Sequence, residues 1–477
     1  MIRLNRNIVR DKIHACWIGK NIGGTMGQPY ECKTTMNDIK GFSTPKGEVI
    51  GNDDLDLQLV WLKAIEDHGP DALTEQTLGE YWMSYIPPHW NEYGQCKANM
   101  KLGLLPPLCG EYNNKWKHSN GAWIRTEVWA CMAPAAPDVA IRYAQMDACV
   151  DHGSGEGTYA AMFVAAMESA AFVIDDLRAL IEIGLTKIPQ NCRMARAVKL
   201  ICECYDNGVD WVEARNLLVK DSEDLGWFMA PANVGFALLG MLYGEGDFKK
   251  SMILAINCGD DTDCTAATLG SLFGIMHGTA GIPADWSEHI GDSIVTKAVD
   301  RSMWRLPKTC TELTNRVYNM IPLMLGCNRA PVCLADEDAI PAEDAAKFRG
   351  GDLAAGYAAI PGNSVNFKFI WGSCRVVLPD GPECEPGKPV KVQFRVSNND
   401  PSPKPLTLTW HLPEGWAVTG VKKHIALPHL AHASAPKTTF EAEIIPGDNV
   451  EASNRIVLVM EAAGRPVAAM IPIVLIG

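Results

Sequence analysis

The sequence lacks features that mark several common classes of protein. No run of about 18 or more apolar residues occurs, so a membrane span is not expected. Lysine and arginine total 43 against 56 acidic residues, and the net charge of -13 argues against a general nucleic-acid binder. The sixteen cysteines form no paired CxxC zinc pattern. We therefore expect no nucleic-acid or membrane partner, while self-association into a homo-oligomer is left open.

The cysteines also lack regular spacing, so most are expected to be free, buried thiols, which favours a reducing compartment. The N-terminal stretch "MIRLNRNIVRDKIHACWIGK" contains basic residues but no apolar signal core. A cytoplasmic location is expected on these grounds. A periplasmic or secreted location is the alternative if a signal peptide has been removed.

The composition changes along the 477 residues, which is enough chain for roughly two or three domains. Apolar residues at helical spacing, such as Leu55, Leu59 and Leu62, predict a single all-α domain over residues 1–330. Residues 331–365 are polar and acidic and are typical of a linker. Short alternating segments such as "VKVQFRV" and "LTLTWHL" predict an immunoglobulin-like β-sandwich over residues 366–477.

Two clusters of acidic residues stand before apolar helices without a basic neighbour in the sequence. The stretch from Lys250 to Gly278 has no further lysine or arginine, although it carries three aspartates at 260, 261 and 263. A second trio at 53, 54 and 56 has no basic residue after it until Lys63. One aspartate suffices to cap a helix, whereas three close carboxylates repel one another unless a cation lies between them. A metal site shared by the two clusters is the better explanation.

The ligand types narrow the choice of metal. Both clusters offer carboxylate, hydroxyl and amide oxygens, and neither contains histidine. Oxygen donors suit Mg²⁺, Mn²⁺ or Ca²⁺ and disfavour Zn²⁺. Several carboxylates could hold two ions, which would clamp substrate hydroxyls or activate a water.

Five ordered motifs carry a resemblance to a known family. They are "GKNIGGTMGQPYE" (19–31), "GNDDLD" (51–56), "SNGAWIR" (119–125), "DACVDHG" (147–153) and "DTDCTAATLG" (261–270). Their order and spacing resemble the ADP-ribosylglycohydrolase family over about residues 10–290. The glycine-rich run in the first motif fits neither the P-loop nor the dinucleotide fingerprint, and close helix packing explains it better.

The resemblance implies an all-α domain with two Mg²⁺ or Mn²⁺ ions and hydrolysis of an ADP-ribosyl glycosidic bond. Glu31 corresponds to the family's catalytic glutamate, which would polarise a water or protonate the leaving group at a furanoside C1. The implied metal ligands are Asn52, Asp53, Asp54, Asp261 and Asp263.

This chain departs from the family pattern at four places. Asn52 replaces a threonine ligand, and Cys264 replaces a second threonine although a thiol is a poor ligand for Mg²⁺. Asp56 is an additional acid that could supply the missing donor. Asp260 stands where the family usually has glycine.

Four further residues are candidates for substrate binding: Asn120, Gly121, His152 and Gly153. For each pair an ordinary structural explanation stays open. Asn-Gly is a common turn, and the histidine could simply be satisfied at the end of a helix. Arg125 is expected to pair with a buried acid.

Three functions follow from this sequence. The first is hydrolysis of an N- or O-glycosidic bond at C1 of a ribofuranosyl group, with an ADP-ribosyl compound as substrate. The second is a carbohydrate glycosidase acting on a furanoside glycan or glycoside, which the added β-sandwich favours by association only. The third is a non-catalytic binding relative, which the retained aspartates and Glu31 disfavour.

Overall fold

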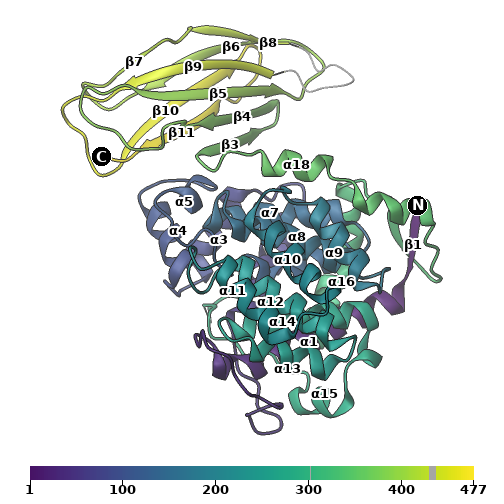
Figure 1. The fold of residues 1–477 in the computed structure, drawn as a ribbon. Helices are drawn as coiled ribbons and strands as arrows, with labels where there is room; N and C mark the ends of the chain where they lie inside the picture. Colours follow the sequence, from purple (N-terminus) through teal and green to yellow (C-terminus); the bar gives the residue numbers. More distant parts are fainter. Residues whose placement is uncertain (301, 429–436) are drawn as a thin grey trace. The chain divides into compact units, whose positions relative to one another are not determined.

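The computed structural model describes residues 1–300, 302–428 and 437–477 (Figure 1). The chain divides into two compact units. The first contains Met1–Gly94 and Lys115–Ala359, and the second contains Gln95–Asn114 and Ile360–Gly477. The predicted order of a helical domain followed by an all-β domain is confirmed.

The first unit is built almost entirely from helices. In chain order they are α1 (Arg6–Gly27), α2 (Asp53–His68), α3 (Glu75–Tyr85), the start of α4 (Asn91–Lys101), α6 (Glu127–Met132), α7 (Pro137–His152), α8 (Glu156–Ala170), α9 (Leu177–Thr186), α10 (Arg193–Asp206), α11 (Trp211–Asp221), α12 (Ala230–Gly244), α13 (Phe248–Asn257), α14 (Thr262–His277), α15 (Ala284–Ile290), α16 (Cys310–Cys327), α17 (Ala342–Ala346) and α18 (Asp352–Ala358). Strand β1 (Ile2–Asn5) pairs in parallel with β2 (Val332–Ala335), so residues beyond 330 continue this unit.

Helices α1 and α14 pack backbone to backbone at the centre of this unit. A Cβ atom at Gly19 would lie 2.1 Å from the Gly270 carbonyl oxygen, and one at Gly23 would lie 2.2 Å from the Ala266 carbonyl carbon. Glycine at these helical positions removes the side chains that would otherwise keep the two helices apart. The close helix packing expected from the glycine-rich run is confirmed. It brings the C-terminal end of α1 beside the N-terminal end of α14.

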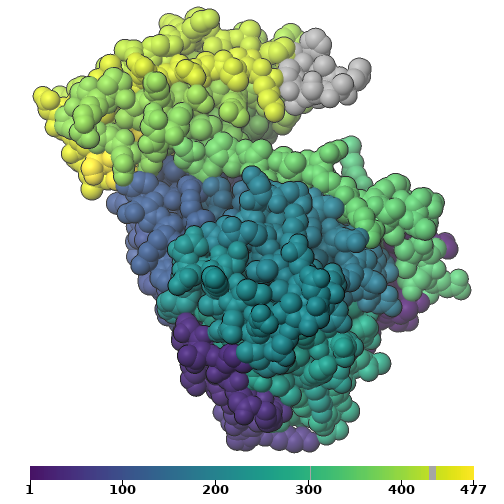
Figure 2. Space-filling model, in the orientation of Figure 1, coloured from purple at the N-terminus to yellow at the C-terminus, as the bar shows by residue number. Residues whose placement is uncertain are grey.

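A long loop follows α1 and crosses the surface of the helical unit. In the space-filling view this part of the chain belongs to the purple surface at the lower left (Figure 2), in the place of the purple loop near α13 and α15 in Figure 1. Phe42 stacks on His289 with ring centroids 3.9 Å apart, and the Ile39 amide donates to Asn257 Oδ1 at 2.8 Å. These contacts hold the segment that begins directly after Glu31.

The second unit contains two antiparallel sheets and the end of α4 with α5 (Leu108–Glu111). One sheet has the order β3-β4-β5-β9-β7, formed by Ser364–Phe369, Gly372–Val377, Val390–Asn398, Lys437–Ile445 and Ala417–Thr419. The other has the order β11-β10-β6-β8, formed by Ala469–Leu475, Asn454–Ala462, Lys404–His411 and His424–Leu427. Alternate residues of β5 are buried, and Phe394 meets Trp410 of the other sheet at 5.7 Å.

Two further features concern the cysteines and the hydropathy of the helices. All sixteen cysteines lie among the described residues, none is part of a disulfide, and most are buried. No helix in the described part of the chain combines the length and apolar character that a bilayer crossing requires.

Candidate active site

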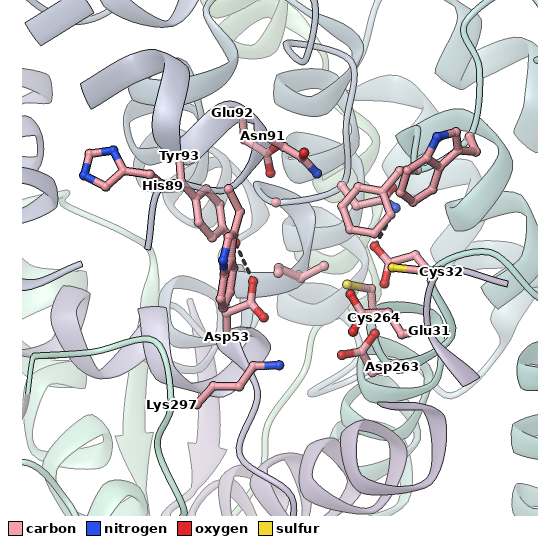
Figure 3. Close-up of a pocket in the computed structure, with 17 residues that line it drawn as sticks. Glu31, Cys32, Asp53, His89, Asn91, Glu92, Tyr93, Asp263, Cys264 and Lys297 are labelled. Carbon is pink, nitrogen blue, oxygen red and sulfur yellow. Dashed lines mark hydrogen bonds between the residues drawn. The ribbon is translucent and has the colours of Figure 1, made fainter. Parts of the chain in front are cut away.

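A cavity of about 510 Å³ opens in the helical unit where α1, α2, α4 and α14 begin or end (Figure 3). Its lining residues come from stretches far apart in the sequence. They are Glu31, Cys32, Asp53, His89, Trp90, Asn91, Glu92, Tyr93, Asn120, Gly121, Ile124, Trp227, Phe228, Asp261, Asp263, Cys264 and Lys297. Residues of both acid clusters therefore line one cavity.

Glu31 is fixed between the end of α1 and the start of α14. It ends the short 3₁₀ turn Gln28–Tyr30, and its neighbour Cys32 donates its backbone amide to the Asp260 carbonyl oxygen at 3.0 Å. In return, the Asp260 amide donates to the Lys33 carbonyl oxygen at 2.7 Å. This pair of hydrogen bonds holds the Glu31 backbone beside the second acid cluster.

Asp260 supports this arrangement and does not line the cavity. Its φ of +67° lies in the left-handed region, where glycine is the usual residue and aspartate is tolerated. Its carboxylate accepts the Phe228 amide at 3.0 Å and 3.2 Å. The backbone geometry explains why a glycine is usual here, and the carboxylate supplies an anchor for the 228 loop.

The three aspartates at the start of α2 have three different environments. Asp53 lines the cavity and accepts the Tyr93 hydroxyl at 2.8 Å. Asp54 is fully buried, with the Cys264 Sγ 3.7 Å from its Oδ2. Asp56 turns away from the cavity and accepts the backbone amides of Lys297 and Ala298, both at 2.6 Å. In this structure Asp56 therefore fixes the loop that carries Lys297.

Asn52 precedes this helix and lies against α1. Its side chain makes no capping hydrogen bond, and a Cβ atom added at Gly24 would fall 2.0 Å from its Nδ2. It is absent from the lining of the cavity as described.

Asp261 and Asp263 enter the cavity from the N-terminal end of α14. Asn120 donates its Nδ2 to Asp261 Oδ2 at 2.7 Å, and the Trp123 indole fixes the amide by donating to Asn120 Oδ1 at 3.0 Å. The Asp261 backbone amide donates to Asn233 Oδ1 at 3.2 Å. Asn120, expected in the site, thus orients one of its carboxylates.

The carboxyl groups form two overlapping groups of three that could hold a cation. One is Glu31, Asp261 and Asp263, and the other is Asp54, Asp263 and Cys264; within each group the donor atoms lie within 4.8 Å of one another. Within the described residues, the Oδ1 atoms of Asp54, Asp261 and Asp263 are buried and accept no hydrogen bond. Buried carboxylate oxygens without donors are the features that divalent cations satisfy, so the donor set fits the expected metal.

The electrostatics of the cavity favour protonated carboxyls or a bound cation. Burial, followed by repulsion from Asp263 and Asp53, raises the pKa of Glu31 to about 8. Burial and neighbouring carboxylates also raise the pKa of Asp54 and of Asp261 well above the ordinary range. The cluster therefore resists full ionisation unless positive charge is supplied.

Two lysines from remote positions supply some of that charge. Lys20 of α1 is buried, donates to Glu127 Oε1 at 2.6 Å, and lies 3.9 Å from Asp54 Oδ1. Lys297 extends into the space between Asp53 and Asp263 (Figure 3). Burial lowers the pKa of Lys297, but attraction to Asp53, Asp263 and Glu31 outweighs burial and raises it. Neither lysine could be assigned to the site from the sequence, because each lies far along the chain from the aspartates that it approaches.

The family model for ADP-ribosylglycohydrolase matches residues 5–319, about two thirds of the chain. This chain belongs to the ADP-ribosylglycohydrolase family. The members of that family are hydrolases acting on glycosidic bonds.

Two individual proteins resemble this chain over a short stretch or at low sequence identity. "ADP-ribosylarginine hydrolase Tri1" of Pseudomonas putida (strain GB-1) is 37% identical over 54 residues, which span 11% of this chain and 15% of the relative. The solved structure of an "ADP-ribosylglycohydrolase-related protein complex" aligns with a TM-score of 0.42 and 18% identity, covering 67% of this chain and 99% of that chain.

The histidine of the "DACVDHG" motif does not line the cavity. His152 is fully buried, with Nδ1 2.8 Å from Asp151 Oδ1 and Nε2 3.3 Å from the Ser119 hydroxyl. Neither His152 nor Gly153 is among the lining residues, whereas Gly121 and Glu92 are. A Cβ atom at Gly121 would fall 2.2 Å from Glu92 Oε1, so this glycine makes room for the carboxylate.

Arg125, in the third motif, is structural as expected. Its buried guanidinium donates to Asp147 at 3.0 Å and to Asp151 at 2.8 Å. Through Asp151 this network also reaches His152. The motif residues that do not line the cavity therefore support those that do.

Aromatic side chains form part of the cavity wall. Trp90 and Tyr93 precede and begin α4, and Trp227 and Phe228 precede α12. Trp227 and Phe228 were missed in the sequence, where "GWFMAPANVGF" has no distinguishing spacing. Flat aromatic faces suit sugar rings and nucleobases.

Proposed function

We propose that this enzyme hydrolyses the glycosidic bond at C1 of the ribofuranosyl group in an ADP-ribosyl compound, with divalent cations held by its cavity carboxylates. The observation that carries the proposal is that Glu31 belongs to one of two three-residue donor groups that share Asp263. The aspartates of these groups have buried Oδ1 atoms that accept no hydrogen bond within the described residues. Family membership supports the reaction class.

Asp54, Asp261 and Asp263 would hold the cations, with Asp53 at the rim of the same cavity. Mg²⁺ or Mn²⁺ bound there would supply positive charge toward the ribose 2′- and 3′-hydroxyls and hold the sugar in place. Two ions are proposed because two of the three donor groups in the described residues share Asp263, while the third, Glu92 with Asp151 and His152, is separate from them.

Glu31 has the properties of a general acid and base. Its pKa of about 8 keeps a proton on the carboxyl near neutral pH in the cation-free site. In the proposed reaction, a protonated Glu31 donates to the leaving-group atom while the bond to C1 breaks through an oxocarbenium-like transition state. The resulting carboxylate then accepts a proton from the water that attacks C1.

Other side chains that line the cavity suit the phosphates and the adenine of an ADP-ribosyl group. Lys297 is the single lysine or arginine among the described lining residues and could meet a phosphate. Trp90, Tyr93, Trp227 and Phe228 offer faces for the adenine or the leaving group.

The second candidate is hydrolysis of a furanoside glycan or glycoside with the same carboxylates. The observation that favours it is the scarcity of cations around the cavity, which carries five acidic residues against one lysine. A neutral furanoside requires no phosphate-binding cation, whereas a diphosphate does.

A substrate panel separates the two candidates. The metal-free chain would be supplied with Mg²⁺ or Mn²⁺ and offered ADP-ribosylated protein, small ADP-ribosyl compounds and aryl furanosides without phosphate. Release of free ADP-ribose, detected by chromatography, is the expected result. Cleavage of the furanosides alone would replace the first proposal with the second, and no cleavage of any substrate would contradict both.

A further inference from the structure

The two groups of three donors in the cavity are chemically unequal. Glu31, Asp261 and Asp263 offer only oxygen, whereas the group of Asp54 and Asp263 includes the sulfur of Cys264. Oxygen donors favour hard cations such as Mg²⁺, and a thiolate favours borderline or soft cations. This difference exists because cysteine stands directly after Asp263 in the first turn of α14.

Cys264 is placed to bind a cation together with the carboxylates. Its side chain lines the cavity, yet the residue is only 6% exposed. Its Sγ donates a long hydrogen bond to Asp54 Oδ2 at 3.7 Å, so the thiol and this carboxylate are direct neighbours. The Oδ1 atoms of Asp54 and Asp263 are buried and accept no hydrogen bond within the described residues.

Lys20 does not take the place of a cation in this group. Its ammonium lies 3.9 Å from Asp54 Oδ1, but it is 2.6 Å from Glu127 Oε1 and 2.7 Å from the Ile124 carbonyl oxygen. Its shorter hydrogen bonds are therefore made to Glu127 and Ile124 and not to Asp54. Asp54 Oδ1 therefore keeps unsatisfied acceptor capacity, while its Oδ2 faces the Cys264 thiol.

We propose that Cys264 is a metal ligand, and that with Asp54 and Asp263 it binds a borderline cation such as Co²⁺ or Zn²⁺ in preference to Mg²⁺. On binding, the Sγ–H bond breaks, the proton leaves to solvent and an Sγ–metal bond forms, without oxidation or reduction. The oxygen-only group beside it remains suited to Mg²⁺. The two positions would thus differ in selectivity, an inference that rests on the metal site of the proposed function.

The test is spectroscopic and does not depend on turnover. The full chain, stripped of metal and kept reduced, is titrated with Co²⁺ in the presence of excess Mg²⁺. A near-ultraviolet thiolate-to-Co²⁺ charge-transfer band should appear and saturate, and bound cobalt is counted by elemental analysis. Cys264→Ser should lose the band. Cys32→Ser is the matched control, because Cys32 also lines the cavity but belongs to neither donor group, and it should keep the band.

Several results would overturn the proposal. These are bound Co²⁺ without the band in the unaltered protein, a band that persists in Cys264→Ser, a band lost in Cys32→Ser, or Co²⁺ fully displaced by Mg²⁺. If Cys264→Ser does not fold, Cys264→Thr serves, because it restores an oxygen of similar size.

Failure of this inference is distinguishable from failure of the proposed function. Mg²⁺-dependent release of ADP-ribose without any thiolate band would reject only the sulfur ligand. Absence of ADP-ribose release together with a saturating band would reject the proposed reaction and leave the sulfur ligand supported.

Discussion

Asp263 and Glu31 belong to the same donor group in the cavity, but their proposed roles differ. Asp263 belongs to both donor groups of the cavity, so its carboxylate would be needed at both of the proposed cation positions. Glu31 belongs to one group and carries a pKa of about 8, which suits it to proton transfer.

Replacing Glu31 by glutamine separates these roles. The amide leaves an oxygen in the same place but cannot transfer the proton, so kcat should fall roughly 10²- to 10⁴-fold. Divalent binding, measured by calorimetry, should remain within a few-fold of the unaltered protein. Asp263→Asn is the matched comparison and should weaken both binding and turnover. Equal loss of metal binding in both variants would contradict a proton-transfer role for Glu31.

Lys297 is expected to recognise the phosphate part of the substrate. Removing a charged hydrogen bond costs about 1.5–3 kcal/mol, so Lys297→Met should raise KM for an ADP-ribosyl substrate roughly 10- to 100-fold. KM for an aryl ribofuranoside without phosphate should hardly change. Lys40→Met, at an exposed lysine, is the control. If both substrates are affected alike, Lys297 acts on the carboxylates and not on a phosphate.

The sequence was enough to predict which aspartates lie in the site, but not which groups hydrogen-bond to them or lie near them. Asp53, Asp261 and Asp263 could be found because three acids before an apolar helix exceed what capping requires. The neighbours in the sequence could not show that Asp56 turns toward the 297–298 amides. Nor could they show that Lys20 and Lys297 approach from helix and loop positions far away along the chain.

At the scale of elements, the site depends on how closely α1 approaches α14. Gly23→Ala would place a Cβ 2.2 Å from the Ala266 backbone, and overpacking of a core typically costs about 1–3 kcal/mol. We therefore expect a lower melting temperature. Gly356→Ala in the exposed helix α18 is the control, because no atom of the described residues lies within 4 Å of its Cβ; that change should be neutral or slightly stabilising. Equal melting temperatures for the two variants would contradict the packing argument.

The glycine spacing in α1 made this helix contact predictable, since small residues four apart lie on one face. The composition of residues 95–114 gave no comparable signal. These residues belong with the β-sheets, although they lie between two cavity-lining stretches of the sequence. The unit to which a short segment belongs depends on the distant residues that it packs against. Those residues cannot be identified from the pattern of the segment itself.

At the scale of the whole molecule, the raised pKa values make stability depend on pH. An acid whose pKa is raised in the folded state binds more protons in that state than in the unfolded state. The folded state therefore becomes less stable as pH rises from the ordinary carboxyl pKa to the raised pKa. Glu31 extends this window to about pH 8, and Asp54 and Asp261 act in the same direction. In chelator, the melting temperature should therefore fall between pH 5 and about 8.

Bound cations should reverse this loss. Mg²⁺ bound to the ionised cluster would stabilise the folded state by mass action, so the increase in melting temperature on adding Mg²⁺ should be larger at pH 8 than at pH 5. Asp263→Asn provides the control, with a smaller increase at both pH values. A Mg²⁺ effect independent of pH would contradict the view that these carboxyls hold the cation.

The measurement that tests the central claim most directly is the initial rate of ADP-ribose release from an ADP-ribosyl substrate. It would be made on the unaltered chain and on Asp263→Asn, each with Mg²⁺ or Mn²⁺ and again after chelation. We expect the unaltered chain to release ADP-ribose with a divalent cation. Release should be low after chelation and should recover when the cation is added back. Asp263→Asn should release little ADP-ribose under either condition. Full activity in chelator, or full activity of Asp263→Asn, would contradict the central claim.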